Sequence, residues 1–164
     1  MVAIAETADG VRRAHELATT ARVAALMLGA IDLGRELLYE PRPDGHELLY
    51  ARSKLVLDSA AAGIRGPFDG VYGALRDTDG LAAECRLARS LGLRGKACIH
   101  PAQVEVVNRA FAPNEGELAW AERVLAAYRS GREEGRGAVG AGGEMVDAAV
   151  VERARRLLEE GGRE

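Results

Sequence analysis

The chain has 164 residues, a length typical of one domain, and 48% of them are hydrophobic, which is ordinary for a protein with a buried core. Its formal net charge of −3 argues against a general nucleic-acid binder, which would carry a basic surplus. No apolar run approaches the roughly 20 residues that span a bilayer, and no basic-then-apolar signal pattern occurs, so we expect a cytoplasmic protein with no membrane association. The two cysteines, Cys85 and Cys98, are too few for a disulfide framework, so we expect reduced thiols.

Strand-like and helix-like segments alternate along the chain. Short apolar runs predict strands over residues 2–5, 22–30, 68–73 and 95–100. Helical spacing of apolar residues predicts helices over 7–21, 48–63, 77–92, 101–110, 114–130 and 148–160. The helix over 77–92 is the best framed, since acidic N-cap candidates precede it and Gly92 closes it.

This alternation predicts an α/β fold, because parallel strands need helical crossovers between them. Four strand–helix units make about half of a TIM-barrel type (β/α)8 fold, whose usual length is ~250 residues. We therefore expect residues 1–134 to form the C-terminal half of such a barrel with trailing helices. Residues 135–164, a glycine-rich segment and a helix, would then be a lid or a subunit-swapped element, with a plain linker as the alternative.

Two carboxylates follow predicted strands. Glu6 comes directly after residues 2–5, and Asp32 comes just after residues 22–30. In parallel α/β folds reactive groups gather at the carboxyl ends of strands, and two carboxylates there suit octahedral Mg²⁺, which keeps several waters. The alternative for each acid is an N-cap of the following helix.

Three further polar residues are candidates for a structural or functional role. Asp147 precedes the last predicted helix and by position is an N-cap candidate. His100, at the end of a predicted strand, is either a general base or a hydrogen-bonded structural residue, and we favour the structural role. Lys96 either contacts an anionic substrate or is simply solvated.

Four segments carry a family resemblance: "AIAETADGV", "LMLGAIDLGREL", "GLRGKACIHPAQVEVVNRAF" and "GGEMVD". With these, the chain resembles the C-terminal half of the citrate lyase beta subunit-like enzymes, which belong to the HpcH/HpaI aldolase superfamily. The resemblance runs from about residue 2 to residue 160, and the segment over 95–103 is its most specific part.

The resemblance implies roles for three acids. Glu6 and Asp32 match the family's Mg²⁺ carboxylates, and Asp147 matches an acid/base group that reaches a neighbouring subunit's active site. The implied activity is a Mg²⁺-dependent acyl-CoA lyase or aldolase reaction, which makes or breaks a C–C bond beside a carbonyl of an acyl-CoA or 2-oxo acid substrate. Two positions depart from the family pattern: Ile31 stands where Glu is usual, and Ala74 where Asp is frequent.

Two alternatives remain open at this stage. The same metal and acid would also serve a malyl- or citramalyl-CoA thioesterase. The chain would otherwise be a truncated, non-catalytic association subunit, because the upstream half that carries the family's substrate-binding arginines is missing. A half barrel also leaves unpaired strand edges, so we expect a homo-oligomer or a complementing N-terminal half.

Overall fold

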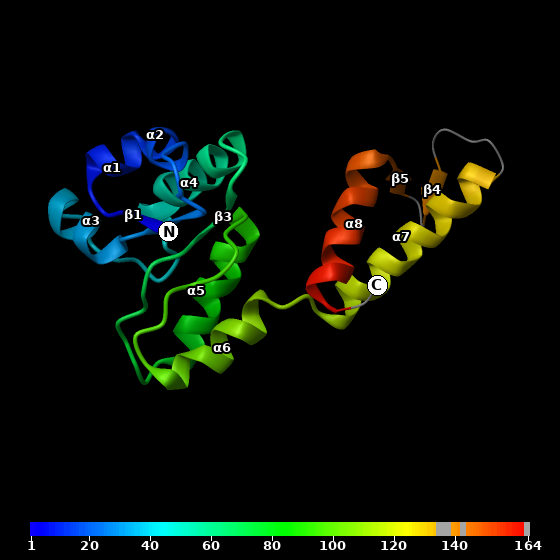
Figure 1. The fold of residues 1–164 in the computed structure, drawn as a ribbon. Helices are drawn as coiled ribbons and strands as arrows, with labels where there is room; N and C mark the ends of the chain where they lie inside the picture. The colour runs from blue at the N-terminus through cyan, green and yellow to red at the C-terminus, as the bar shows by residue number, and fades with distance from the viewer. Residues whose placement is uncertain (134–138, 142–143, 163–164) are drawn as a thin grey trace. The chain divides into compact units, whose positions relative to one another are not determined.

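The computed structural model describes residues 1–133, 139–141 and 144–162, and Figure 1 shows its elements in chain order. The chain divides into two compact units, Met1–Phe111 and Ala112–Glu164. Each unit has a core of its own, and we describe each by itself.

Unit 1 is built on a short parallel sheet in the order β1-β2-β3. Its strands are β1 (Val2–Ala5), β2 (Ala25–Leu28) and β3 (Arg65–Phe68). The first two predicted strands are confirmed, although β2 is shorter than predicted. The strand predicted over 68–73 was wrong, because β3 lies three residues earlier in the chain. The predicted strand over 95–100 is reduced to one parallel bridge, between Asp69 and Lys96. The structure thus contains a partial α/β sheet and no closed barrel among the described residues.

The helices of unit 1 are α1 (Ala8–Arg12), α2 (Ala14–Ala18), α3 (Ala30–Leu37), α4 (Leu49–Ala61), α5 (Thr78–Leu91) and α6 (Pro101–Phe111), with a 3₁₀ turn η1 (His46–Leu48) before α4. Of these, α1, α2 and α4 pack on the sheet. The single helix predicted over 7–21 is broken at Arg13, and α3 was not predicted. The core packs Leu26 and Leu28 of β2 against apolar residues of these helices, including Val11, Ala14 and Leu55.

The predicted frame of α5 is confirmed at both ends. Asp77 is the N-cap, and its side chain accepts a hydrogen bond from the backbone N–H of Gly80. Gly92 closes the helix with φ 102°, a left-handed conformation that residues with a side chain rarely adopt. Pro101 opens α6, as the sequence predicted, since proline fits the first turn of a helix.

Unit 2 pairs two helices with a small hairpin. Helix α7 (Glu115–Glu133) packs on α8 (Ala148–Glu160), and β4 (Val139–Ala141) pairs antiparallel with β5 (Glu144–Val146). The two helices match the predictions, whereas the hairpin was not foreseen in the glycine-rich segment. Residues 135–138, 142–143 and 163–164 of the predicted lid lie outside the described residues. The guanidinium of Arg153 lies 4.9 Å from the centre of the Trp120 ring, a cation–π distance.

In the described ranges, 1–133 and 144–162, no helix is long and apolar enough to cross a membrane.

Candidate functional site

Glu6 lies at the carboxyl edge of the sheet, beside the start of α3. Strands β1 and β2 are parallel neighbours that end together, with Ala5 opposite Leu28. Just beyond, the N–H of Gly29 donates to the carbonyl of Ala5 at 2.9 Å. A Cβ placed on Gly29 would stand 2.3 Å from the Cβ of Glu6, which is closer than real atoms allow. The missing side chain of Gly29 therefore makes the space that Glu6 occupies.

Asp32 lies in the first turn of α3, the helix that Gly29 opens. Its side chain is half-exposed and pairs with the exposed Arg35 at 3.0 Å. A second contact links the start of α1 to the last turn of α3, because the backbone N–H of Ala8 donates to Glu36 Oε2 at 3.1 Å. The structure thus brings Glu6 close to the helix start that carries Asp32.

The N-cap alternative is wrong for both acids. Thr7 caps α1, since its hydroxyl accepts from the N–H of Gly10 at 3.0 Å, and Gly29 is the N-cap residue of α3. Neither acid is consumed by capping, so both carboxylates remain available as ligands. Two carboxylates are oxygen ligands of the kind that Mg²⁺ takes from a protein, with waters completing its coordination, so this donor set fits the ion. Within the part of the chain that the structure describes, no group of three or more metal-ligating side chains occurs.

Asp147 belongs to unit 2, where it caps α8. Its Oδ1 accepts a hydrogen bond from the backbone N–H of Val150 at 2.9 Å, and the side chain is exposed. The N-cap interpretation of this residue is confirmed. A carboxylate that caps a helix with one oxygen still presents its second oxygen to its surroundings.

His100 has a structural contact. Its Nδ1 accepts from the backbone N–H of Ala102 at 3.1 Å, at the start of α6, which supports the structural reading. Of the two departures from the family pattern, Ile31 is 62% exposed and Ala74 is exposed in the loop after β3.

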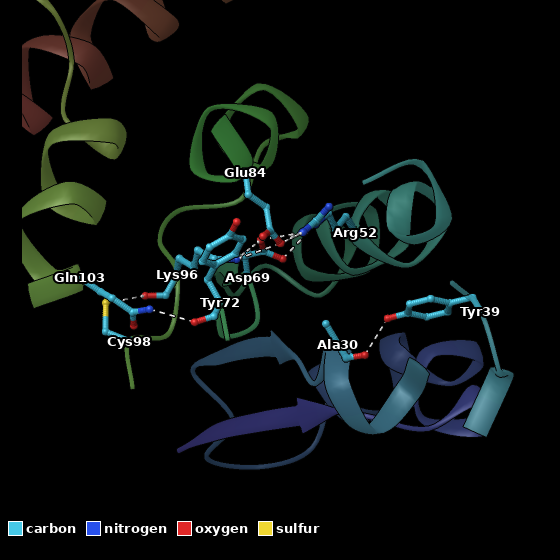
Figure 2. Close-up of polar contacts among 9 residues, drawn as sticks. All are labelled: Ala30, Tyr39, Arg52, Asp69, Tyr72, Glu84, Lys96, Cys98 and Gln103. Carbon is cyan, nitrogen blue, oxygen red and sulfur yellow. Dashed lines mark hydrogen bonds and ion pairs between the residues drawn. The ribbon is translucent and has the colours of Figure 1, made fainter. Parts of the chain in front are cut away.

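A buried ion-pair network, which the sequence analysis missed, lies between the sheet and helices α4 and α5 (Figure 2). Asp69 follows β3 and receives Arg52 Nε and Nη2 at 3.0 Å each, and Lys96 Nζ at 2.8 Å. Glu84 of α5 accepts from the same Arg52 Nη2 at 2.5 Å and from Lys96 Nζ at 3.1 Å. We call these four residues, Arg52, Asp69, Glu84 and Lys96, the ionic network. The interpretation of Lys96 as a solvated residue is therefore wrong, because its side chain is fully buried.

The network fixes the charge state of Asp69. Burial acts to raise the pKa of this carboxyl, but the neighbouring cations Lys96 and Arg52 outweigh burial, so its pKa lies below the ordinary value. For Arg52, burial likewise disfavours the charged form, and its contacts with Asp69 and Glu84 hold the pKa above the usual value. Each ion therefore depends on its partners to stay charged away from water.

A cavity of about 910 Å³ lies beside the network in unit 1. It is lined by Ala30, Ile31, Tyr39, Glu47, Tyr72 and Glu84, among others. Tyr39 donates its hydroxyl to the carbonyl of Ala30 at 2.7 Å, which closes the loop after α3 onto the helix start (Figure 2). On another side of the cavity, Gln103 holds the loop that carries Tyr72, because Gln103 Nε2 donates a hydrogen bond to the carbonyl of Tyr72 at 2.9 Å. Glu6 and Asp32 are not among the lining residues, so this cavity and the carboxylate edge are distinct places in unit 1.

Parallel strands with helical crossovers, and acids beyond their carboxyl ends, define a partial α/β fold of the kind from which TIM barrels are built. The family model for HpcH/HpaI aldolase/citrate lyase matches residues 1–101, and that for C-C bond lyases of the TIM-barrel fold matches residues 52–157. The chain belongs to the HpcH/HpaI aldolase/citrate lyase family, which confirms the resemblance seen in the sequence.

Curated relatives and a solved structure agree with this assignment. The citrate lyase subunit beta of Leuconostoc mesenteroides subsp. cremoris is 40% identical over 159 residues, which are 96% of this chain and 52% of that protein. A (3S)-malyl-CoA thioesterase of Cereibacter sphaeroides is 37% identical, over 95% of this chain and 54% of its own length. The protein CitE of Mycobacterium tuberculosis, solved with magnesium, acetoacetate and coenzyme A, superposes with a TM-score of 0.86 at 38% identity, over 99% of this chain and 61% of CitE. The chain thus spans about half the length of the curated relatives it matches.

Proposed function

We propose that this chain supplies the metal-binding part of a Mg²⁺-dependent carbon–carbon lyase or aldolase that acts on an acyl-CoA or 2-oxo acid substrate of the citryl-, malyl- or citramalyl-CoA kind. The observation that carries the proposal is the position of Glu6 beside the start of the helix that bears Asp32, at the carboxyl edge of a parallel sheet. The CitE structure with magnesium, acetoacetate and coenzyme A, and the citrate lyase relatives, support the same activity.

Glu6 and Asp32 are the residues that would hold the metal. When bound there, Mg²⁺ would polarise the substrate carbonyl and stabilise the negative charge that develops on its oxygen. Glu6 is oriented by its packing against Gly29, and α3 holds Asp32 through its backbone. Arg35 pairs with Asp32 and has to release it when a metal is bound, a small cost because the pair is exposed.

Asp147 is the proposed proton-transfer group, acting at the active site of a neighbouring subunit in a homo-oligomer. Its carboxylate is exposed, and its Oδ1 is held by the start of α8, so the group is oriented rather than freely rotating. In this proposal the segment 135–164 is a lid or a subunit-swapped element that delivers the acid. The proposed setting is the cytoplasm, in agreement with the two free cysteines, Cys85 and Cys98.

A thioesterase is the second candidate, favoured by the 37% identity to a malyl-CoA thioesterase. Product analysis separates the two: acetyl- or propionyl-CoA with a keto acid means C–C cleavage, whereas free CoA with an intact hydroxy acid means hydrolysis. The third candidate, a non-catalytic association subunit, is supported if the chain binds a partner and neither alone nor in the complex turns over these substrates.

Metal binding gives the direct test, with Mn²⁺ as a paramagnetic probe that takes the same oxygen ligands as Mg²⁺. We expect the chain to lower the electron paramagnetic resonance signal of free Mn²⁺, and Mg²⁺ to restore it by competition. Glu6→Gln and Asp32→Asn should each weaken binding at least about tenfold, because each removes a charged ligand. Glu40→Gln is the matched control, an exposed acid outside the site, and should bind as the parent does. Equal binding by all four proteins would refute the metal assignment.

A further inference from the structure

Helix α3, which carries Asp32, has weak support of its own. It has eight residues, and isolated helices shorter than about 12–15 residues are marginal in water. Its N-cap residue, Gly29, has no side chain with which to cap the first turn. Gly34 lies in its interior, where glycine lowers the stability of a helix. The position of Asp32 therefore depends on contacts that come from outside the helix.

Tyr39 supplies such a contact after the chain has left α3. Its hydroxyl donates to the carbonyl of Ala30, the first residue of α3, at 2.7 Å (Figure 2). Its ring lies over Gly34, since a Cβ placed there would stand 2.9 Å from Tyr39 Cζ and 3.0 Å from the hydroxyl oxygen. A larger residue than glycine would displace the ring. Tyr39 thus contacts α3 both before and after Asp32 in the sequence.

A strained residue returns the chain to α3. Leu38, the C-cap, has φ 56° and ψ 30°, a left-handed conformation that is uncommon for a bulky residue. Its N–H donates to the carbonyl of Gly34 at 2.9 Å. The Leu38 side chain is 84% exposed, so its own packing does not stabilise the turn. What the turn achieves is the placement of Tyr39 on the helix, and persistent backbone strain is found most often at functional sites.

The place of α3 matters for the pair of carboxylates. Asp32 and its ion-pair partner Arg35 both belong to α3 and move with it, whereas Glu6 follows β1. The separation of the two carboxylates is therefore set by where the start of α3 lies. Mg²⁺ demands near-ideal octahedral geometry with ligands at about 2.0–2.1 Å, so a small displacement of the helix start would spoil a shared site.

We infer that Tyr39 is a positioning residue that fixes the start of α3 and, through it, places Asp32 to share one cation with Glu6. The role of the cation rests on the proposed function, whereas the hold of Tyr39 on α3 does not. Tyr39 acts through the backbone at Ala30 and through the space over Gly34, and it is not itself a ligand.

Amide hydrogen exchange of the metal-free chain tests the hold on α3. The N–H of Leu33 donates to the carbonyl of Gly29 at 3.0 Å and closes the first turn. Tyr39→Phe keeps the ring and removes the hydroxyl, so this amide should exchange about fivefold faster, the effect of one lost hydrogen bond. Tyr72→Phe is the matched control, because it removes a hydroxyl bond of the same 2.7 Å length, to Asp77, from the same cavity. Unchanged exchange in Tyr39→Phe, or an equal rise in both variants, would overturn the inference.

Two substitutions of Leu38 test the turn with little loss of packing. Leu38→Gly adopts the left-handed conformation without steric cost and should exchange at Leu33 as the parent does. Leu38→Val puts a β-branched residue there, which disfavours the turn, and should behave like Tyr39→Phe. The same exchange rate in both Leu38 variants would mean that the turn does not place Tyr39, which contradicts the inference.

Mn²⁺ binding tests the consequence for the metal site. Tyr39→Phe should weaken binding at least about threefold in the electron paramagnetic resonance titration, and Tyr72→Phe should not. Urea midpoints of both variants provide the comparison, because a merely structural role would weaken binding only in step with lost stability. Parent-like binding by Tyr39→Phe, alongside weak binding by Asp32→Asn, would overturn the inference. If Asp32→Asn also binds as the parent does, the proposed metal site fails, and the exchange rates alone decide the hold on α3.

Discussion

Replacing Asp69 by Asn should destabilise unit 1 strongly. Asp69 accepts three hydrogen bonds from two buried cations, two at 3.0 Å from Arg52 and one at 2.8 Å from Lys96. Asn has the same shape but only one acceptor oxygen, and its NH₂ group would face a donor. The network would then hold two cations against Glu84 alone. Removing one partner of a buried ion pair costs about 3–5 kcal/mol.

Urea unfolding followed by far-ultraviolet circular dichroism measures this loss. With a urea dependence of about 2 kcal/mol per M, the midpoint should fall by about 1.5–2.5 M. Glu105→Gln is the control, since it breaks the exposed pair with Arg109 and should change the free energy of unfolding by less than about 1 kcal/mol. Equal shifts in the two variants would refute the view that burial makes the network important.

The same variant tests the pKa of Asp69. The cations lower this pKa in the folded state, below an unfolded value of about 3.9. The stabilisation by the carboxylate is therefore fully present above that value and is lost as the pH falls through the folded pKa. Asn does not titrate, so Asp69→Asn should make the urea midpoint less dependent on pH below about 4. If Asp69→Asn left the pH dependence of the urea midpoint unchanged, the group responsible for that dependence would be a residue other than Asp69.

Three further predictions concern single positions. Gly29→Ala should destabilise the chain by about 1–3 kcal/mol and weaken Mn²⁺ binding, because the added Cβ would meet Glu6. In the control Gly73→Ala the added Cβ enters open space, so neither the thermal melt nor the Mn²⁺ titration should change. Asp147→Asn keeps the cap of α8, so turnover should fall with little loss of helix, while Asp147→Ala should cost about 1 kcal/mol more in thermal unfolding; full activity of both would refute the proton-transfer role. The hydrogen bond to Asp77 raises the pKa of Tyr72 to about 12, so Asp77→Asn should lower the highest tyrosine pKa in a spectrophotometric titration.

Local signals predicted the helices well where caps and breakers frame them. Asp77, Gly92 and Pro101 act through their own backbone geometry, so the ends of α5 and the start of α6 could be predicted from neighbouring residues. The strand β3 was placed too late because "FDGVYG" reads as a strand, while the sheet uses Arg65–Phe68, which includes a glycine and a proline. Pairing with β2 decides that choice, and pairing is not visible in a short window.

In the candidate site, too, some features follow from neighbouring residues and others depend on tertiary packing. The position of Glu6 after a strand predicted its place at the carboxyl edge, and the structure adds that Gly29 makes room for it. The ionic network escaped prediction, because Arg52 and Lys96 are 44 positions apart and only the fold shows that they share Asp69. A charged residue inside a predicted core segment was the available signal. Its partners depend on tertiary packing, which spacing does not encode.

The charges of Arg52, Asp69, Glu84 and Lys96 add to zero, two positive against two negative. A single substitution that removes the charge of any one of these four residues leaves the network with an unbalanced charge. A paired substitution, such as Asp69→Asn with Lys96→Met, restores neutrality. Replacement of a whole buried network by apolar side chains is often tolerated. Descendants of this sequence should therefore lose these positions in compensated pairs, and a survey of variants selected for folding alone would reveal that coupling.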